Sequence, residues 1–144
     1  MEKKKIGVKI DGRDYNVGSG KTILEACKEV GIKIPSLCYL KDVSHNASCA
    51  ICVVDVKGAK SMVRSCVTTV GEGMEITTTT PNILAERRAI MEVYDVNHPL
   101  ECGVCDQSGE CELQNYTLEV GVDSQTYSIK DTHKPAQNWG LIHY

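Results

Sequence analysis

Cysteine is the residue type whose number and spacing point most clearly to chemistry in this sequence. The chain of 144 residues contains eight cysteines and four histidines. Thiolates and imidazoles are ligands for zinc and for iron–sulfur clusters. The apolar stretch Ile6–Ile10, behind the N-terminal lysines, is interrupted by Lys9 and does not resemble a secretory leader. We therefore expect a cytoplasmic protein whose cysteines are metal ligands and not disulfides.

The first group of cysteines has a spacing typical of an iron–sulfur cluster. Its four members are separated by ten, two and thirteen residues: Cys38, Cys49, Cys52 and Cys66. In plant-type cluster binding a long loop supplies three cysteines and a distant segment supplies the fourth. The alternative is structural zinc, but four-cysteine zinc sites usually contain two close pairs. Only Cys49 and Cys52 are close here.

The second group combines one histidine with three cysteines. His98, Cys102, Cys105 and Cys111 lie within fourteen residues, so they can surround one compact metal centre. We expect Ser108 to cap a helix whose first turn contains Cys111, where the helix dipole favours an anionic sulfur. His98 would bind through one ring nitrogen and donate its other N–H to a neighbouring acceptor. A thioredoxin-like role for the Cys102–Cys105 pair would require a βαβ setting, which the pattern does not suggest.

The strands predicted for the first half would position the first group. Residues 6–10 alternate as a half-buried strand, Asp11-Gly12 predicts a hairpin turn, and the return strand contains Val17. A loop is expected over residues 35–52. Further strands are expected over residues 52–56, 62–67 and 74–78. Together with one helix, these strands predict an α+β domain.

That helix begins at a capping box formed by Thr22 and Glu25 and ends at Gly31. Cys27 lies on its apolar face, so we interpret it as a small core residue and not as a ligand.

The second half predicts two helices. Thr80 and Pro81 can start the first of them, which must end before Pro99. Five apolar residues in it have roughly helical spacing: Ile83, Leu84, Ile90, Met91 and Tyr94. The second helix follows Ser108 and stops at Gly121. Its expected inward residues are Leu113, Tyr116 and Val120.

Composition excludes several classes of function. The formal net charge is −3, so a broad basic face for nucleic acid is not expected. The longest apolar run, Cys49–Val54, is too short to cross a bilayer. No nucleophile, general base or substrate pocket is apparent, so we predict no catalytic residues.

The cysteine motifs resemble the N-terminal region of a known family. It is the large iron–sulfur subunit of NADH:quinone oxidoreductase (complex I), with the matching subunits of NAD-linked hydrogenases and formate dehydrogenases. The stretches that carry the resemblance are Ile34–Tyr39, Cys49–Cys52, Arg64–Cys66 with Gly73-Met74, and His98–Gln114. One departure is Ala50, where members of the family often carry arginine. A second is length, because the family's large subunits continue beyond the region that this chain spans.

The resemblance implies two cofactors and their ligands. A 2Fe–2S cluster would be bound by Cys38, Cys49, Cys52 and Cys66 on a β-grasp ferredoxin fold, over residues 1–79. A 4Fe–4S cluster would be bound by His98, Cys102, Cys105 and Cys111 in a small, mainly helical domain, over residues 80–120. Residues 121–144 would form an extended tail.

The function implied is an electron relay inside a multisubunit oxidoreductase. Single electrons would pass between an NAD(P)H-oxidising subunit that contains flavin and iron–sulfur clusters and a further redox subunit. Neither nucleic acid binding nor direct membrane insertion is expected. Two alternatives are a stand-alone soluble ferredoxin and a zinc-stabilised interaction module. The terminal acceptor, and the choice of NAD or NADP, leave no signature in the sequence.

Overall fold

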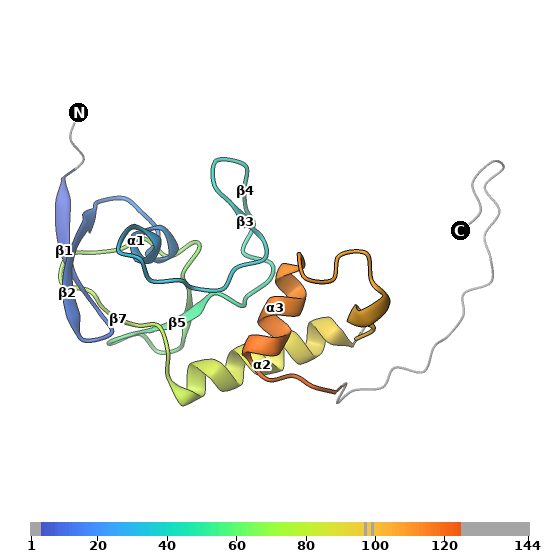
Figure 1. Cartoon of the computed structure of the whole chain (residues 1–144). Helices are drawn as coiled ribbons and strands as arrows, with labels where there is room; N and C mark the ends of the chain where they lie inside the picture. Colours follow the sequence, from blue (N-terminus) through green and yellow to red (C-terminus); the bar gives the residue numbers. More distant parts are fainter. Residues whose placement is uncertain (1–3, 97, 99, 125–144) are drawn as a thin grey trace.

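The computed structural model describes residues 4–96, 98 and 100–124 (Figure 1). The tail predicted over residues 121–144 lies outside the described residues except for its first four. A five-stranded sheet with helix α1 (Ile23–Glu29) forms one end of the molecule, and helices α2 (Pro81–Asp95) and α3 (Glu112–Glu119) form the other (Figure 1).

The sheet is mixed, with strand order β2-β1-β7-β5-β6. Its strands are β1 (Lys5–Ile10), β2 (Arg13–Gly18), β5 (Val53–Val56), β6 (Val63–Arg64) and β7 (Glu75–Thr77). Strand β1 pairs antiparallel with β2 and parallel with β7, whereas β5 is antiparallel to both β7 and β6. Since β1 and β7 are far apart in sequence, their pairing closes the domain. The predicted α+β class is confirmed.

The hairpin between β1 and β2 turns where the sequence predicts. Asp11 and Gly12 both have positive φ, of 50° and 80°, as a two-residue turn that matches the twist of the strands requires. The Asp11 carboxylate also accepts hydrogen bonds from the Thr78 backbone N–H at 2.7 Å and from its hydroxyl at 2.6 Å. The turn therefore holds the chain where it leaves the sheet toward α2.

Helix α1 starts with the predicted capping box. The Thr22 hydroxyl accepts from the Glu25 backbone N–H at 3.3 Å, and the Glu25 carboxylate accepts from the Thr22 backbone N–H at 3.0 Å. The buried face of α1 includes Cys27, which is fully buried among the core residues of the sheet domain. Burial raises the pKa of the Cys27 thiol to about 12, so this side chain is a neutral core residue.

The segment predicted as a loop over residues 35–52 contains an additional two-stranded sheet. Strands β3 (Tyr39–Leu40) and β4 (Ser44–His45) pair antiparallel and project from the body of the domain (Figure 1). The sequence pattern missed them because strands of two residues are too short to show an alternation.

Helix α2 is capped as predicted, with the Thr80 hydroxyl accepting from the Ile83 backbone N–H at 3.1 Å and Pro81 in the first turn. Its buried stripe differs from the expected one. Leu84 and Tyr94 are exposed, and the buried residues repeat every four positions: Ile83, Arg87, Met91 and Asp95. Two of these four are charged, which an apolar pattern cannot anticipate.

Helix α3 begins later than predicted, so the interpretation of Ser108 as its N-cap is wrong. The N-cap is Cys111, whose sulfur accepts from the Gln114 backbone N–H at 3.5 Å. Ser108 instead donates its backbone N–H to the Cys105 carbonyl at 3.0 Å. The helix ends at Glu119, and Gly121 follows with φ 73°, in agreement with the predicted stop.

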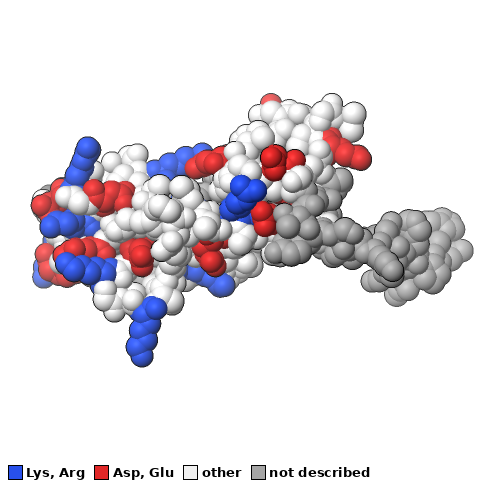
Figure 2. Space-filling model, turned by 90° about the horizontal axis from the view of Figure 1, so that it is seen from below, with Lys and Arg blue, Asp and Glu red and all other residues white. Residues whose placement is uncertain are grey.

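The surface shows no segregation of charge on the face drawn in Figure 2, where basic and acidic side chains are interspersed. Among the described residues, no helix is both long and apolar enough to cross a membrane.

Candidate metal centres

The four cysteines of the first group converge beside the edge of the sheet domain. The sulfurs of Cys38 and Cys49 lie 3.3 Å apart, and the Cys49 backbone N–H donates to the Cys38 sulfur at 3.4 Å. The side chain of Cys66 is hydrogen-bonded to that of Cys52, and the charges of Cys38 and Cys49 also raise its pKa. Sequence positions up to 28 residues apart are thus brought into one site.

Short elements hold each of these cysteines. Cys38 directly precedes β3, Cys52 directly precedes β5, and Cys66 follows β6. Between Cys49 and Cys52 the backbone turns at Ala50, which has φ 58°. A left-handed residue in this position curls the loop around the sulfurs. Cys49, Cys52 and Cys66 are exposed by only 3, 0 and 1 %.

The electrostatics of this site suit a cationic group that several thiolates bind together. Burial, followed by the hydrogen bond and charge of Cys52, raises the pKa of Cys66 to about 12. Burial also raises the pKa of Cys49. For Cys38 burial acts in the same direction, but hydrogen bonds from the backbone and side chain of Cys49 outweigh it and lower the pKa. Four thiolates, three of them buried, would repel each other without a cationic group between them, and the iron of a cluster is such a group.

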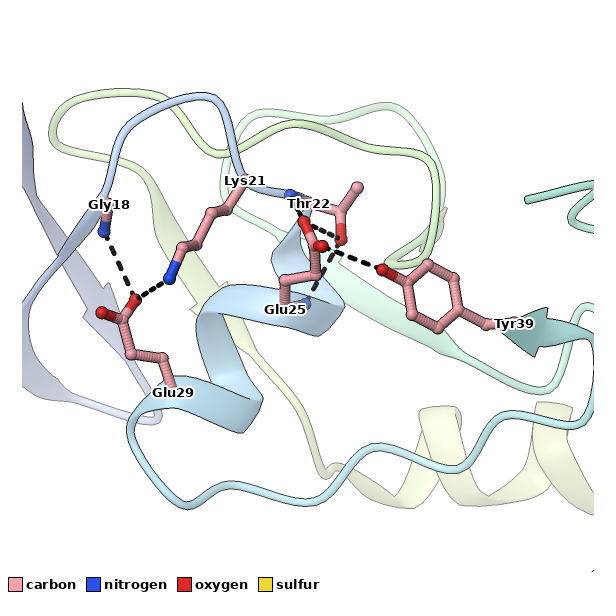
Figure 3. Close-up of polar contacts among 6 residues, drawn as sticks. All are labelled: Gly18, Lys21, Thr22, Glu25, Glu29 and Tyr39. Atoms are coloured by element: carbon pink, nitrogen blue, oxygen red, sulfur yellow. Dashed lines mark hydrogen bonds and ion pairs between the residues drawn. The ribbon is translucent and has the colours of Figure 1, made fainter. Parts of the chain in front are cut away.

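The segment that follows Cys38 is tied to helix α1 (Figure 3). The Tyr39 hydroxyl donates to the Glu25 carboxylate at 2.9 Å, and the same carboxylate completes the capping box with Thr22. Nearby, Glu29 accepts from the Lys21 ammonium at 2.9 Å and from the Gly18 backbone N–H at 3.3 Å. The helix therefore positions the loop from the side opposite to α2 and α3.

The four residues of the second group line one cavity of about 550 Å³. Cys102 lies at the start of the 3-10 turn η1 (Cys102–Val104), and Cys105 follows the turn with its backbone N–H donated to the Cys102 carbonyl at 3.3 Å. Cys111 is the N-cap of α3, so the positive end of that helix faces its sulfur. Apolar side chains share the wall of the cavity: Leu100, Val104, Leu113, Leu118 and Val122.

A buried carboxylate at this cavity was not anticipated from the sequence. Asp95, exposed by 1 %, accepts from the Thr117 hydroxyl at 3.2 Å and lines the cavity together with His98. Burial raises the pKa of Asp95, and the hydrogen bond from Thr117 and the charge of His98 act in the opposite direction. The signal that could have found Asp95 is its position four residues after Met91 on the buried stripe of α2.

The second unanticipated residue is Arg87, which follows Ile83 on the same stripe. Its side chain donates to the Val53 carbonyl at 2.9 Å and to the Thr78 carbonyl at 3.1 Å. Arg87 therefore joins α2 to the sheet domain directly after Cys52.

The two candidate centres share an apolar core. Residues of the first cysteine loop pack against α2 and α3 in a cluster that contains Cys49, Ile51, Met91, Tyr116 and Val122. The Tyr116 hydroxyl also accepts from the Ser36 backbone N–H at 3.4 Å. Helix α3 thus contacts the first loop through Tyr116 and the second centre through Cys111.

The chemistry of the donor sets fits iron–sulfur clusters. Seven of the eight candidate ligands are cysteines, whose thiolates are the usual ligands of 2Fe–2S and 4Fe–4S clusters, and a histidine replaces cysteine in some of these centres. In the described part of the chain, no three His, Cys, Asp or Glu side chains are placed to bind one metal ion together.

Comparison with known proteins identifies the family. A family model described as a 2Fe-2S iron-sulfur cluster binding domain matches residues 3–81. A second, described as the NADH-ubiquinone oxidoreductase-G iron-sulfur binding region, matches residues 87–126. The chain belongs to the family of 2Fe-2S iron-sulfur cluster binding domains and carries the second iron–sulfur region after it. The predicted cofactors, one 2Fe–2S and one 4Fe–4S cluster, are confirmed.

Two named relatives are similar to this chain over most of its length. The chain is 40 % identical over 138 residues to the NADPH-Fe(3+) oxidoreductase subunit alpha of Geobacter sulfurreducens, covering 95 % of this chain and 16 % of that protein. It is 42 % identical over 118 residues to the NADH-ubiquinone oxidoreductase 75 kDa subunit of Reclinomonas americana, covering 82 % of this chain and 17 % of that subunit. The chain therefore spans only a small part of the length of these relatives.

A solved structure has the same fold. It is an NAD+-reducing [NiFe]-hydrogenase in the H2-reduced state, with a TM-score of 0.79 and 25 % identity. The match covers 91 % of this chain and 55 % of the hydrogenase chain. The predicted resemblance to NADH:quinone oxidoreductase and NAD-linked hydrogenase subunits is thus confirmed.

Proposed function

We propose that this chain relays single electrons between an NAD(P)H-oxidising flavoprotein subunit and a further redox subunit of an oxidoreductase complex. The clusters supply the electron chemistry, since each accepts and releases one electron at a time. The protein's residues bind the clusters, exclude water and set their electrostatics. The observation that supports this proposal most directly is the apolar core that joins the first cysteine loop to Leu113 and Val122, which line the cavity of the second group.

The proposed ligands are those predicted from the sequence. Cys38, Cys49, Cys52 and Cys66 would hold the 2Fe–2S cluster in a β-grasp domain over residues 1–79. The order of the sheet and the parallel pairing of β1 with β7 support this fold. His98, Cys102, Cys105 and Cys111 would hold the 4Fe–4S cluster in a helical domain over residues 80–120. Their common cavity supports this set.

Exposed apolar side chains beside both centres favour a docked subunit over a diffusible carrier. In the first region Leu40 and Val43, on the β3–β4 hairpin after Cys38, are exposed by 60 and 80 %. In the second, Val104 and Leu118 are exposed by 84 and 69 % and line the cavity. Apolar groups that surround a redox centre are suited to contact with a neighbouring protein.

Anaerobic reconstitution with iron and sulfide tests the cofactor assignment. We expect about six iron atoms per chain, two in one cluster and four in the other, and two distinct electron paramagnetic resonance signals on reduction. About two iron atoms and one signal would remove the second centre. Bound zinc in a colourless protein would contradict both centres.

Isolation of the native complex tests the relay. We expect the chain to co-purify with a flavoprotein that oxidises NADH or NADPH, and both clusters to be reduced when the nucleotide is added. Val43→Asp and Val104→Asp should weaken this association, and Val93→Asp on the exposed face of α2 is the matched control. A chain that elutes as a monomer with no flavoprotein would favour a stand-alone ferredoxin.

A further inference from the structure

Arg87 is a buried cation beside the start of β5, which Cys52 directly precedes. It is exposed by 4 %, and its side chain donates hydrogen bonds to two neutral groups, the Val53 carbonyl at 2.9 Å and the Thr78 carbonyl at 3.1 Å. Its Nε donor is buried with no hydrogen-bond partner among the described residues. A guanidinium stays protonated in proteins, so a full positive charge is held at this position.

The charge of Arg87 lacks an acidic partner in direct contact. Among the residues that the structure describes, no carboxylate lies within ion-pair distance of its guanidinium. Burial lowers its pKa, and the negative charges of Glu119 and of a Cys52 thiolate act against that shift. Buried charges in proteins are normally compensated. Glu119 and Cys52 are therefore the sources of compensating charge, and Cys52 directly precedes Val53, whose carbonyl accepts from Arg87.

We infer that Arg87 sets the reduction potential of the 2Fe–2S cluster by acting as a buried counter-charge next to Cys52. This inference depends on the proposed ligand role of Cys52. A cluster with four thiolates is anionic, and reduction adds one more negative charge. A fixed cation beside it stabilises the reduced form more than the oxidised form, so the potential is higher than without Arg87.

Arg87 is held between the sheet domain and the buried face of α2. The Thr78 carbonyl accepts a hydrogen bond from Arg87, and the Thr78 N–H and hydroxyl donate to the Asp11 carboxylate. Arg87 is one turn from Ile83 and one from Met91, and both are fully buried. The guanidinium is thus held in a buried position beside β5.

Redox titration of the holoprotein, followed by electron paramagnetic resonance, tests this inference. In Arg87→Gln the ratio of reduced to oxidised 2Fe–2S cluster at a fixed potential should fall about tenfold, a shift of about 59 mV for one electron. In Arg87→Lys, which keeps the charge, the ratio should stay within about twofold of the wild type. The 4Fe–4S signal of the same samples is an internal reference and should not shift.

The matched control is Arg88→Gln, because Arg88 is the next residue but is 48 % exposed and paired with Glu92 at 3.1 Å. Its titration should match the wild type. An unshifted Arg87→Gln cluster, or equal shifts in the Gln and Lys variants, would overturn the inference. The second result would assign Arg87 a packing role only.

A second measurement applies if Arg87→Gln does not retain its cluster. In wild-type protein with ¹⁵N-labelled arginine, the reduced 2Fe–2S cluster should show a weak nitrogen coupling that is lost in Arg87→Lys and kept in Arg88→Gln. Absence of this coupling would overturn the inference. Absence of any 2Fe–2S signal from the wild type would instead refute the proposed function.

Discussion

The two candidate centres differ in how much of their geometry the protein supplies. The first is built from cysteines at the ends of strands, and three of its four sulfurs are almost fully buried. In the second, His98 and Cys105 are exposed, and the described residues between the ligands form short-range turns such as Cys105 N–H to the Cys102 carbonyl at 3.3 Å. The comparison indicates that the sheet shapes the first centre, whereas cluster binding itself must organise the second.

Removal of the clusters should produce the largest difference between the two centres. After chelation of iron under reducing conditions, backbone amides over residues 100–111 should lose their protection from hydrogen exchange, because few buried contacts hold them. Amides of β1, β2 and β7 should stay protected, since their ladder does not depend on metal. Equal loss of protection in both regions would show that the first centre also needs its cluster to fold.

Removal of one proposed ligand from each centre should also affect the two centres differently. Cys52→Ala should reduce the iron content from about six to about four atoms and lower the free energy of unfolding by about 2 kcal/mol, because it leaves a cavity in the core. Cys105→Ala should reduce iron to about two atoms with little change in the unfolding of the sheet domain, since Cys105 is exposed. Iron analysis and urea unfolding measure both effects.

Cys27→Ala is the control for this pair, as Cys27 is equally buried but is not a proposed ligand. It should keep about six iron atoms while losing stability. Loss of iron in this variant would contradict the assignment of Cys27 to the core.

Substitution of the buried Asp95 should have a smaller effect, confined to the second centre. Asp95 lines the cavity together with the proposed ligand His98, whose charge affects its pKa. Asp95→Asn should therefore weaken retention of the 4Fe–4S cluster about ten- to hundredfold, the loss typical when a carboxylate beside a metal-binding histidine is removed. Thr117→Val, which removes the hydroxyl that donates to Asp95 at 3.2 Å, should act in the same direction. Cluster loss to a competing chelator measures this, and the exposed Glu86→Gln is the control.

The smallest expected effect lies in the first region. Tyr39→Phe removes the hydrogen bond to Glu25 and should cost about 1 kcal/mol of stability in urea unfolding of the reduced apoprotein. Tyr94→Phe is the control, because its hydroxyl makes no hydrogen bond in the described part of the chain. Equal stability of the two variants would show that Tyr39 does not anchor the loop.

The same contact predicts a dependence on pH. The hydrogen bond from the Thr22 backbone N–H, opposed by burial and aided by Tyr39, lowers the pKa of Glu25 below 4.5. The stability that Glu25 contributes is therefore fully present above about pH 4.5 and is lost as the pH falls through its folded-state value. Glu25→Gln should remove this dependence in acid unfolding of the apoprotein.

The elements that local chemistry determines could be predicted from the sequence. The Asp11-Gly12 turn, the Thr22–Glu25 capping box and the Thr80-Pro81 helix start all depend on residues within four positions of each other. The cysteine spacing predicted an iron–sulfur cluster for the first group and one compact metal centre for the second for a similar reason, because ligand type and loop length limit which metal group can be bound. The 4Fe–4S assignment of the second centre came from the family resemblance.

Only the tertiary structure decided which face of α2 is buried. Residues 83, 87, 91 and 95 point inward because the Val53 and Thr78 carbonyls accept from Arg87 and the Thr117 hydroxyl donates to Asp95. Val53 and Thr117 are distant in sequence from the residues that they contact. An apolar pattern assigns charged residues to solvent, since burial of a charge is favourable only when partners are already in place. The packing of the first cysteine loop on α2 and α3 was settled in the same way, by contacts that exist only after the chain has folded.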